Sequence, residues 1–161
     1  YPHPGGEVKV LTGVDCAFHR GETVAIIGPS GSGKSTLLAL MAGLDRPSGG
    51  EVMLLGKSLA GVAERERAAL RASHLGIVFQ QFHLMAHLTA LENVAVPLDL
   101  LGKSNPDAAR AALAHVGLAH RLTHYPHALA GGECQRTAIA RALVVAPEIL
   151  LADQPSGNFD Q

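Results

Sequence analysis

The stretch Gly28-Pro29-Ser30-Gly31-Ser32-Gly33-Lys34-Ser35 is the most informative part of this 161-residue sequence. It matches the phosphate-loop pattern G-x-x-x-x-G-K-[ST] at every position. The apolar run 23–27 before it predicts a buried strand, and the residues from about 34 to 43 predict a helix. A glycine-rich turn between a strand and a helix points consecutive N–H groups into one hollow, and the helix adds the positive end of its dipole. We therefore expect a chain of phosphates there, with Lys34 supplying positive charge and Ser35 a hydroxyl for Mg²⁺.

A second motif complements this loop. The apolar run Ile149–Ala152 predicts a strand buried on both faces, and Asp153 follows it directly. In phosphate-loop proteins an aspartate at this position holds Mg²⁺ next to the hydroxyl of the loop. The two motifs together favour a nucleotide site over a simple Gly/Ser turn.

The composition limits the classes of function. Hydrophobic residues make up 47% of the chain, charged residues 17%, and the formal net charge is −1. These values indicate a globular protein without a basic surface for nucleic acid. No apolar run reaches the roughly 18 residues that a membrane-spanning helix needs, so we expect no direct insertion into a membrane. Cys16 and Cys134 are too few for a disulfide framework, which fits a reducing cytosol.

Strand and helix patterns alternate along the chain. Strands are predicted at 7–11, 12–18, 23–27, 51–55, 75–79 and 149–152, and helices at 34–43, 64–72, 90–101, 106–116 and 133–145. Thr89 with Glu92, three residues on, predicts a capping box at the start of the helix 90–101. Alternating strands and helices indicate an α/β fold with a mostly parallel sheet covered by helices.

Five stretches together resemble the ATP-binding subunit of ABC transporters. They are the phosphate loop at 28–36, Phe79-Gln80, the segment 129–136, the strand ending at Asp153, and residues 156–160. The segment 129–136 is similar to the family signature L-S-G-G-x-x-x-R. The sequence at 43–47, 88–94 and 155–158 is most similar to the lipoprotein-releasing and macrolide-export ATPases of the family.

The resemblance implies the architecture of the chain. It implies one ATP-binding domain over 1–161: a phosphate-loop NTPase core, an antiparallel β portion at the N-terminus, and a helical signature subdomain at about 82–130. The family sheet continues beyond the last residue, so we expect this sequence to be a fragment. The region of the family's switch histidine then lies outside it.

The resemblance also implies roles for individual residues. The nucleotide would contact Gly28, Pro29, Ser30, Gly31, Ser32, Gly33, Lys34, Ser35, Thr36, Gln80 and Asp153, with Tyr1 stacked on adenine. The Mg²⁺ ligands would be Ser35, Gln80 and Asp153, and the catalytic residues Lys34, Gln80 and Gln154. The ATP held by a second subunit would be faced by the signature residues Leu129, Ala130, Gly131, Gly132 and Glu133. Asp160 would lie at the dimer interface. Arg136 and Arg141 are interpreted as exposed helix charges rather than phosphate contacts.

The implied partners are a transmembrane permease, which the loop from Gln80 to His87 would face, and a second ATP-binding subunit, identical or different. The implied location is cytoplasmic, on the inner face of the plasma membrane through the permease.

Two positions depart from the family pattern. Ala130 replaces the signature serine, and Gln154 replaces the glutamate that serves as general base or orients water. A glutamine amide cannot accept a proton at neutral pH, and general-base catalysis is worth about 10²–10⁴-fold. Two hypotheses therefore stay open: an ATPase that drives a permease, and a degenerate subunit that binds ATP with little or no hydrolysis. A small-molecule kinase or GTPase is disfavoured, because it leaves the segment 129–136 unexplained.

Overall fold

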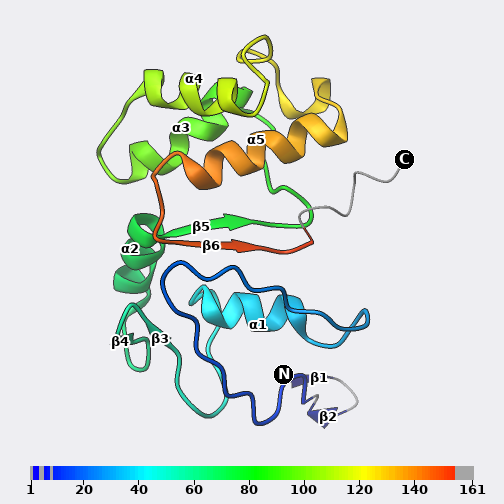
Figure 1. Ribbon diagram of the computed structural model, residues 1–161, viewed down its shortest axis with the longest axis vertical. Helices are drawn as coiled ribbons and strands as arrows, with labels where there is room; N and C mark the ends of the chain where they lie inside the picture. Colours follow the sequence, from blue (N-terminus) through cyan, green and yellow to red (C-terminus); the bar gives the residue numbers. More distant parts are fainter. Residues whose placement is uncertain (1, 4–5, 8, 155–161) are drawn as a thin grey trace.

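A computed structural model describes residues 2–3, 6–7 and 9–154 of the chain. Its centre is a parallel pair of strands, β5 (Leu75–Val78) and β6 (Ile149–Ala152). Helix α5 (Gly131–Leu143) packs on one side of this pair, with α3 (Ala90–Leu100) and α4 (Pro106–His115) beyond it, and α1 (Lys34–Met41) lies on the other side (Figure 1). Helices and strands therefore form layers, which is the α/β class that the sequence predicts.

The remaining elements of the described chain are two hairpins, a helix and a short turn. They are the antiparallel hairpins β1 (Pro2–His3) with β2 (Gly6–Glu7) and β3 (Met53–Leu54) with β4 (Lys57–Ser58), the helix α2 (Glu64–His74), and the 3₁₀ turn η1 (Pro126–Ala128).

Local sequence signals explain where the helices begin. Thr89 Oγ1 accepts the Glu92 N–H at 3.3 Å, and the Glu92 carboxylate accepts the Thr89 N–H at 2.8 Å, so the predicted capping box of α3 is confirmed. At α4, Asn105 Oδ1 accepts the Ala108 N–H at 3.0 Å, and Pro106 occupies the first turn, where its missing N–H costs nothing.

Two hydrophobic cores hold the layers together. One lies among α3, α4 and α5 and contains Ala90, Val94, Ala109, Leu113, Leu118 and Ala140. The other lies where α1, α2, β3, β5 and β6 meet and contains Ala42, Leu54, Leu59, Leu75 and Leu151. The first core gives the helices at 90–143 a packed interior of their own, although the boundaries of a helical subdomain at 82–130 stay a prediction. Among the described residues, no helix is both long enough and apolar enough to cross a membrane.

The predicted strands at 12–18 and 23–27 are wrong for this structure, and residues 9–11 of the first predicted strand are also outside any strand. Ile27 is 92% exposed and Val24 is 53% exposed, so the run before the phosphate loop is not buried either. A strand is stabilised by ladder hydrogen bonds and side-chain pairs with a neighbour. Within the described residues, no strand pairs with this part of the chain.

The prediction that 149–152 is buried on both faces is also wrong. Leu151 is 7% exposed, but its neighbour Leu150 is 50% exposed. The reason is that β6 pairs only with β5 in the described part of the chain, so it is an edge strand.

Candidate functional site

The phosphate loop requires glycine at two positions. Gly31 and Gly33 have φ of 78° and 91°, the left-handed region that residues with a side chain rarely adopt. Gly33 is also packed tightly, because a Cβ there would lie 2.8 Å from Leu11 Cδ2 and 3.2 Å from the Val10 carbonyl oxygen. Gly33 caps the N-terminus of α1. The loop therefore ends with free N–H groups and the positive end of a helix dipole, as the motif predicts.

Lys34 folds back over this loop. Its Nζ donates to the carbonyl oxygen of Gly28 at 2.9 Å and to that of Pro29 at 2.7 Å. These residues border an open hollow of about 280 Å³ that also reaches Ile27 and Leu37. The ammonium group is thus held by weak neutral acceptors at the rim of a hollow, from which phosphate oxygens would attract it more strongly. Ser35 is exposed in the first turn of α1, and Thr36 is partly exposed.

The second part of the site lies at the carboxyl ends of β5 and β6. Val78 pairs with Ala152, and the Asp153 N–H donates to the Val78 carbonyl oxygen at 2.9 Å. Gln80, two residues after β5, and Asp153, directly after β6, therefore follow neighbouring strands at one edge. Figure 1 shows the loop that leads into α1 on the same side of the molecule as the arrowheads of these strands. Gln154 is exposed, with a left-handed φ of 47°.

The loop after Gln80 has an unusual backbone. Phe82 and His83 have φ of 58° and 46°, and the rings of Phe79 and His83 meet edge to face with centroids 4.9 Å apart. Arg141 on α5 donates from Nη2 to the Phe82 carbonyl oxygen at 2.8 Å and from Nη1 to the His83 carbonyl oxygen at 2.7 Å. Burial lowers the pKa of this guanidinium below its ordinary value. The prediction that Arg141 is an exposed helix charge is therefore wrong.

Asn93 is a second residue that sequence reasoning missed. Its side chain is completely buried in α3 and bonds to the end of the loop from Gln80 to His87 and to the two residues that follow. Asn93 Oδ1 accepts the Met85 N–H at 2.7 Å, and Nδ2 lies within 3.1 Å of the carbonyl oxygens of Met85, Leu88 and Thr89. No local pattern distinguishes such an asparagine from an exposed helix residue, so no signal in the sequence could have identified it.

The signature-like segment forms the start of α5. Ala130 is the N-cap, and because alanine has no side-chain acceptor, only half of a capping box exists: Glu133 Oε2 accepts the Ala130 N–H at 2.9 Å. Arg121 Nε donates to Glu133 Oε1 at 2.9 Å. The Ala130 N–H, and next Arg121, hold the pKa of Glu133 below its ordinary value. Ala130 and Gly131 are exposed, so the N-terminus of α5 is accessible from outside.

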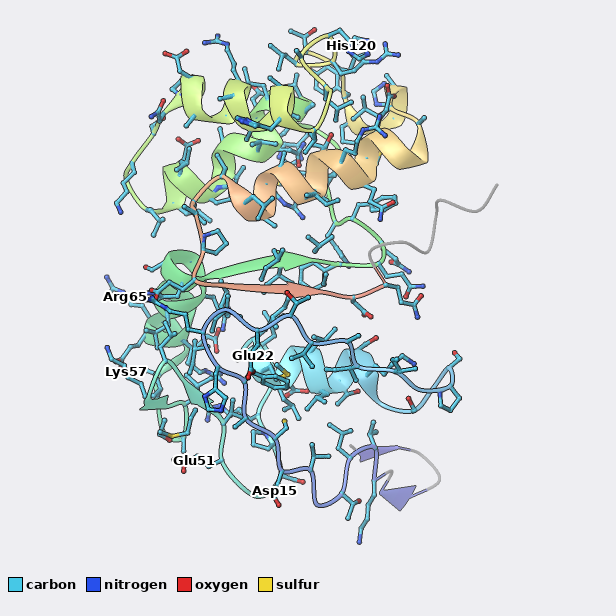
Figure 2. All side chains as sticks on the ribbon, in the orientation of Figure 1. Asp15, Glu22, Glu51, Lys57, Arg65 and His120 are labelled. Atoms are coloured by element: carbon cyan, nitrogen blue, oxygen red, sulfur yellow. The ribbon has the colours of Figure 1, made fainter. Side chains whose placement is uncertain are left out.

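Other predicted residues are not brought into the site. Tyr1 and Asp160 lie outside the described residues. Within the described ranges, no three His, Cys, Asp or Glu side chains come close enough to hold a metal ion. Figure 2 shows the spread of such groups: His120 lies at the outer end of the helical layer, far from Asp15 and Glu51. Asp153 with the hydroxyl of Ser35 and the amide of Gln80 remains the candidate oxygen set for Mg²⁺.

A glycine loop that caps a helix, a lysine at its rim and an aspartate at the end of a parallel strand define a phosphate-loop nucleotide-binding protein. Comparison with known proteins gives the family. The ABC transporter family model matches residues 11–157, and the chain therefore belongs to the ABC transporter family and is an ABC-type ATPase by family. The resemblance found from the motifs is confirmed.

Relatives and solved structures agree with this assignment. The chain is 52% identical to YbbA of Escherichia coli K12, described as an uncharacterized ABC transporter ATP-binding protein, over 96% of this chain and 69% of YbbA. It is 51% identical to the lipoprotein-releasing system ATP-binding protein LolD of Psychrobacter arcticus, over 99% of this chain and 73% of LolD. The dimeric ATP-binding cassette MJ0796, solved with ADP and Pi, superposes with a TM-score of 0.93 at 40% identity, over 98% of this chain and 71% of MJ0796. The superposition on MJ0796 confirms the fold class.

Proposed function

We propose that this chain binds ATP together with Mg²⁺, and that ATP-driven pairing with a second such chain drives a transmembrane permease. The observation that carries this proposal is the pairing of two features: the left-handed glycine loop at the start of α1, and the parallel edge where Gln80 and Asp153 follow β5 and β6. Because the loop and this edge lie on the same side of the molecule, one triphosphate chain could contact both (Figure 1).

The donor groups fit this ligand. Free N–H groups at the start of α1 and the Lys34 ammonium suit phosphate oxygens, and the ammonium would exchange neutral carbonyls for charged acceptors on binding. Ser35, Asp153 and Gln80 offer oxygen atoms of the kind that Mg²⁺ prefers. When bound, Mg²⁺ supplies neutralising charge to the phosphates, while the chain's own residues hold and orient them.

The pairing of two subunits has separate support. MJ0796 was solved as a dimer with ADP and Pi, at 40% identity to this chain. The exposed Ala130 and Gly131 leave the positive end of α5 accessible to an anion held by another molecule. Met85, 40% exposed within the loop from Gln80 to His87, supplies apolar surface on the segment that we propose faces the permease. We accordingly propose a location on the cytoplasmic face of a membrane, through the permease.

A second candidate function is a subunit that binds ATP but hydrolyses it slowly or not at all. Gln154 favours it, because a neutral amide can orient water but cannot accept its proton. Ala130 favours it as well, since the serine hydroxyl that it replaces would donate a hydrogen bond to phosphate, worth about 1–3 kcal/mol with a charged acceptor. The residues proposed to hold Mg-ATP are all present, namely Lys34, Ser35, Gln80 and Asp153. A subunit that hydrolyses ATP therefore stays the first candidate.

The test is Mg-ATP binding and turnover of the full-length protein, as found and as Gln154→Glu. A matched control is Asn105→Asp, which makes the same amide-to-carboxylate change at the exposed N-cap of α4, where aspartate caps equally well. We expect ATP to bind in all three forms, and turnover to rise by about 10²–10⁴-fold only in Gln154→Glu. Absence of ATP binding in all forms would refute the proposed function, and equal turnover in all would refute the degenerate alternative.

A further inference from the structure

The part of the loop directly after Gln80 is bonded by a side chain of α5, the helix that packs on β5. The guanidinium of Arg141, on α5, donates to two consecutive carbonyl oxygens, those of Phe82 and His83, at 2.8 and 2.7 Å. Both side-chain hydrogen bonds that Arg141 makes within the described residues go to this loop. A planar guanidinium presents donors in a fixed fork, so it fixes the direction of both peptide groups at once.

The backbone conformation of Phe82 and His83 needs a stabilising contact from outside the loop. Phe82 and His83 both have a left-handed backbone, which is sterically unfavourable for residues with a side chain and persists only where the surroundings impose it. The turn is tight, because the His83 N–H donates to the Gln81 carbonyl at 2.6 Å and the Phe82 N–H to the Phe79 carbonyl at 3.1 Å. The conformation of the residues directly after Gln80 therefore depends on a group that is distant in sequence.

The position of Arg141 connects two parts of the proposed site. Arg141 lies ten residues after Gly131 in the same helix, which at about 1.5 Å per residue is roughly 15 Å along its axis. The helix starts with the signature-like segment and its later turns hold the Gln80 loop. A helix is stiff over this length, so a displacement of α5 moves the loop with it.

We infer that Arg141 is a positioning residue for Gln80: its guanidinium fixes the loop after β5, and through it the place of the Gln80 side chain relative to Asp153. This inference rests on the proposed function, in which Gln80 contacts the reacting ATP site. In this role Arg141 acts on the site only through the carbonyl groups of Phe82 and His83.

The first measurement is amide hydrogen exchange in the full-length protein, which needs no turnover. Arg141→Gln removes the charge and the fork, Arg141→Lys keeps the charge but not the fork, and Arg110→Gln is the control, since Arg110 on α4 is a 54% exposed arginine paired with Asp107. We expect amides at 80–84 to exchange about tenfold faster in Arg141→Gln, to a smaller extent faster in Arg141→Lys, and unchanged in Arg110→Gln. Amides in the middle of α3 and α4 should be unaffected in all three.

The second measurement separates positioning from folding. In the Gln154→Glu background, in which we expect measurable turnover, Arg141→Gln should lower kcat about tenfold while KM for ATP changes less than about twofold. Combined with Gln80→Ala, it should lower kcat no further than Gln80→Ala alone, because both changes act through one group.

Each outcome either supports or overturns the positioning role of Arg141. Unchanged exchange at 80–84 in Arg141→Gln, or additive effects with Gln80→Ala, would overturn the inference. Faster exchange throughout α3, α4 and α5 would show a general structural role and would also overturn it. If Arg141→Gln does not fold, Arg141→Lys decides: local loosening at 80–84 supports the inference, and unaltered exchange and kcat refute it. Failure of every form to bind ATP would refute the proposed function, while the exchange result would still report on the loop.

Discussion

Gly76, in the middle of β5, should not tolerate even a methyl group. A Cβ there would lie 2.4 Å from the Ala142 carbonyl oxygen, 2.9 Å from Pro147 Cγ and 3.1 Å from Leu150 Cδ1. The first of these atoms belongs to the backbone of α5, so no side-chain rotation relieves the contact. To turn a 2.4 Å approach into an ordinary contact of 3.4 Å, α5 must recede from β5 by about 1 Å. Because α5 covers β5 directly, this displacement would separate the helical layer from the strands (Figure 1).

The cost of Gly76→Ala can be bounded from this geometry. Forcing extra methylene-sized groups into a packed interior costs about 1–3 kcal/mol, and we expect the upper half of that range, because the nearest atom is main chain. For a chain of 150–250 residues, 1 kcal/mol lowers the melting temperature by about 2–4 °C, so the expected decrease is about 4–12 °C. The control is Gly49→Ala, since a Cβ at Gly49 would have no atom within 4 Å and its φ is an ordinary one. That variant should lose no stability, because alanine there only restricts the unfolded chain.

The assay is thermal unfolding of the full-length protein, followed by circular dichroism, for the two variants and the parent. A melting temperature of Gly76→Ala equal to those of the parent and Gly49→Ala would refute the close approach of α5 to β5. It would also weaken the positioning of Gln80, which depends on the same packing.

Two further changes test the residues that hold the site. Asn93→Ala should destabilise the protein by about 1–3 kcal/mol in urea unfolding, because the Met85 N–H and nearby carbonyls lose their buried partner; an unchanged midpoint would contradict the bonds of this side chain. Glu133→Gln should be less stable than the parent at pH 7, because the charged Glu133 carboxylate accepts hydrogen bonds from the Ala130 N–H and from Arg121, and these bonds are also what lowers its pKa. Since that stabilisation is present above the unfolded-state pKa and is lost as the pH falls through the lower folded-state pKa, the stability difference between Glu133→Gln and the parent should begin to shrink below about pH 4.3, the ordinary pKa of glutamate, and should vanish only once the pH is below the folded-state pKa of Glu133. A difference that stays constant in unfolding curves measured through this range would contradict it.

The helices could be predicted from the sequence because their signals are local. Helices α3 and α4 begin at the caps supplied by Thr89 and Asn105. A strand is different, because it exists only where a neighbour offers a ladder. The strand β6 has its predicted bounds because β5 pairs with it. The run 23–27 has the right residues, yet Ile27 is 92% exposed and nothing in the described chain pairs with it.

The candidate site also has a part that could be predicted from local signals and a part that could not. The phosphate loop is contiguous, so its glycines, Lys34 and the helix that follows could be predicted together. The bonds of Arg141 to the loop join residues 58 and 59 positions apart, and no periodicity or spacing encodes them. The role of Arg141 became visible only once the fold had placed α5 over the end of β5.

Gln154→Glu is informative because it changes the chemistry of one group and little else. Glutamine and glutamate have the same length and branching, so both face the same left-handed φ of 47° and carry the same backbone strain. The side chain is exposed, so the carboxylate has no burial cost to meet. A large gain in turnover would therefore report the missing proton acceptor itself, and the natural chain would be an ATP-binding subunit whose site lacks its base. If the natural chain already turns ATP over as fast as Gln154→Glu, the water must be oriented by another group, and Gln80, held by Arg141, is the group at this edge that we would change next.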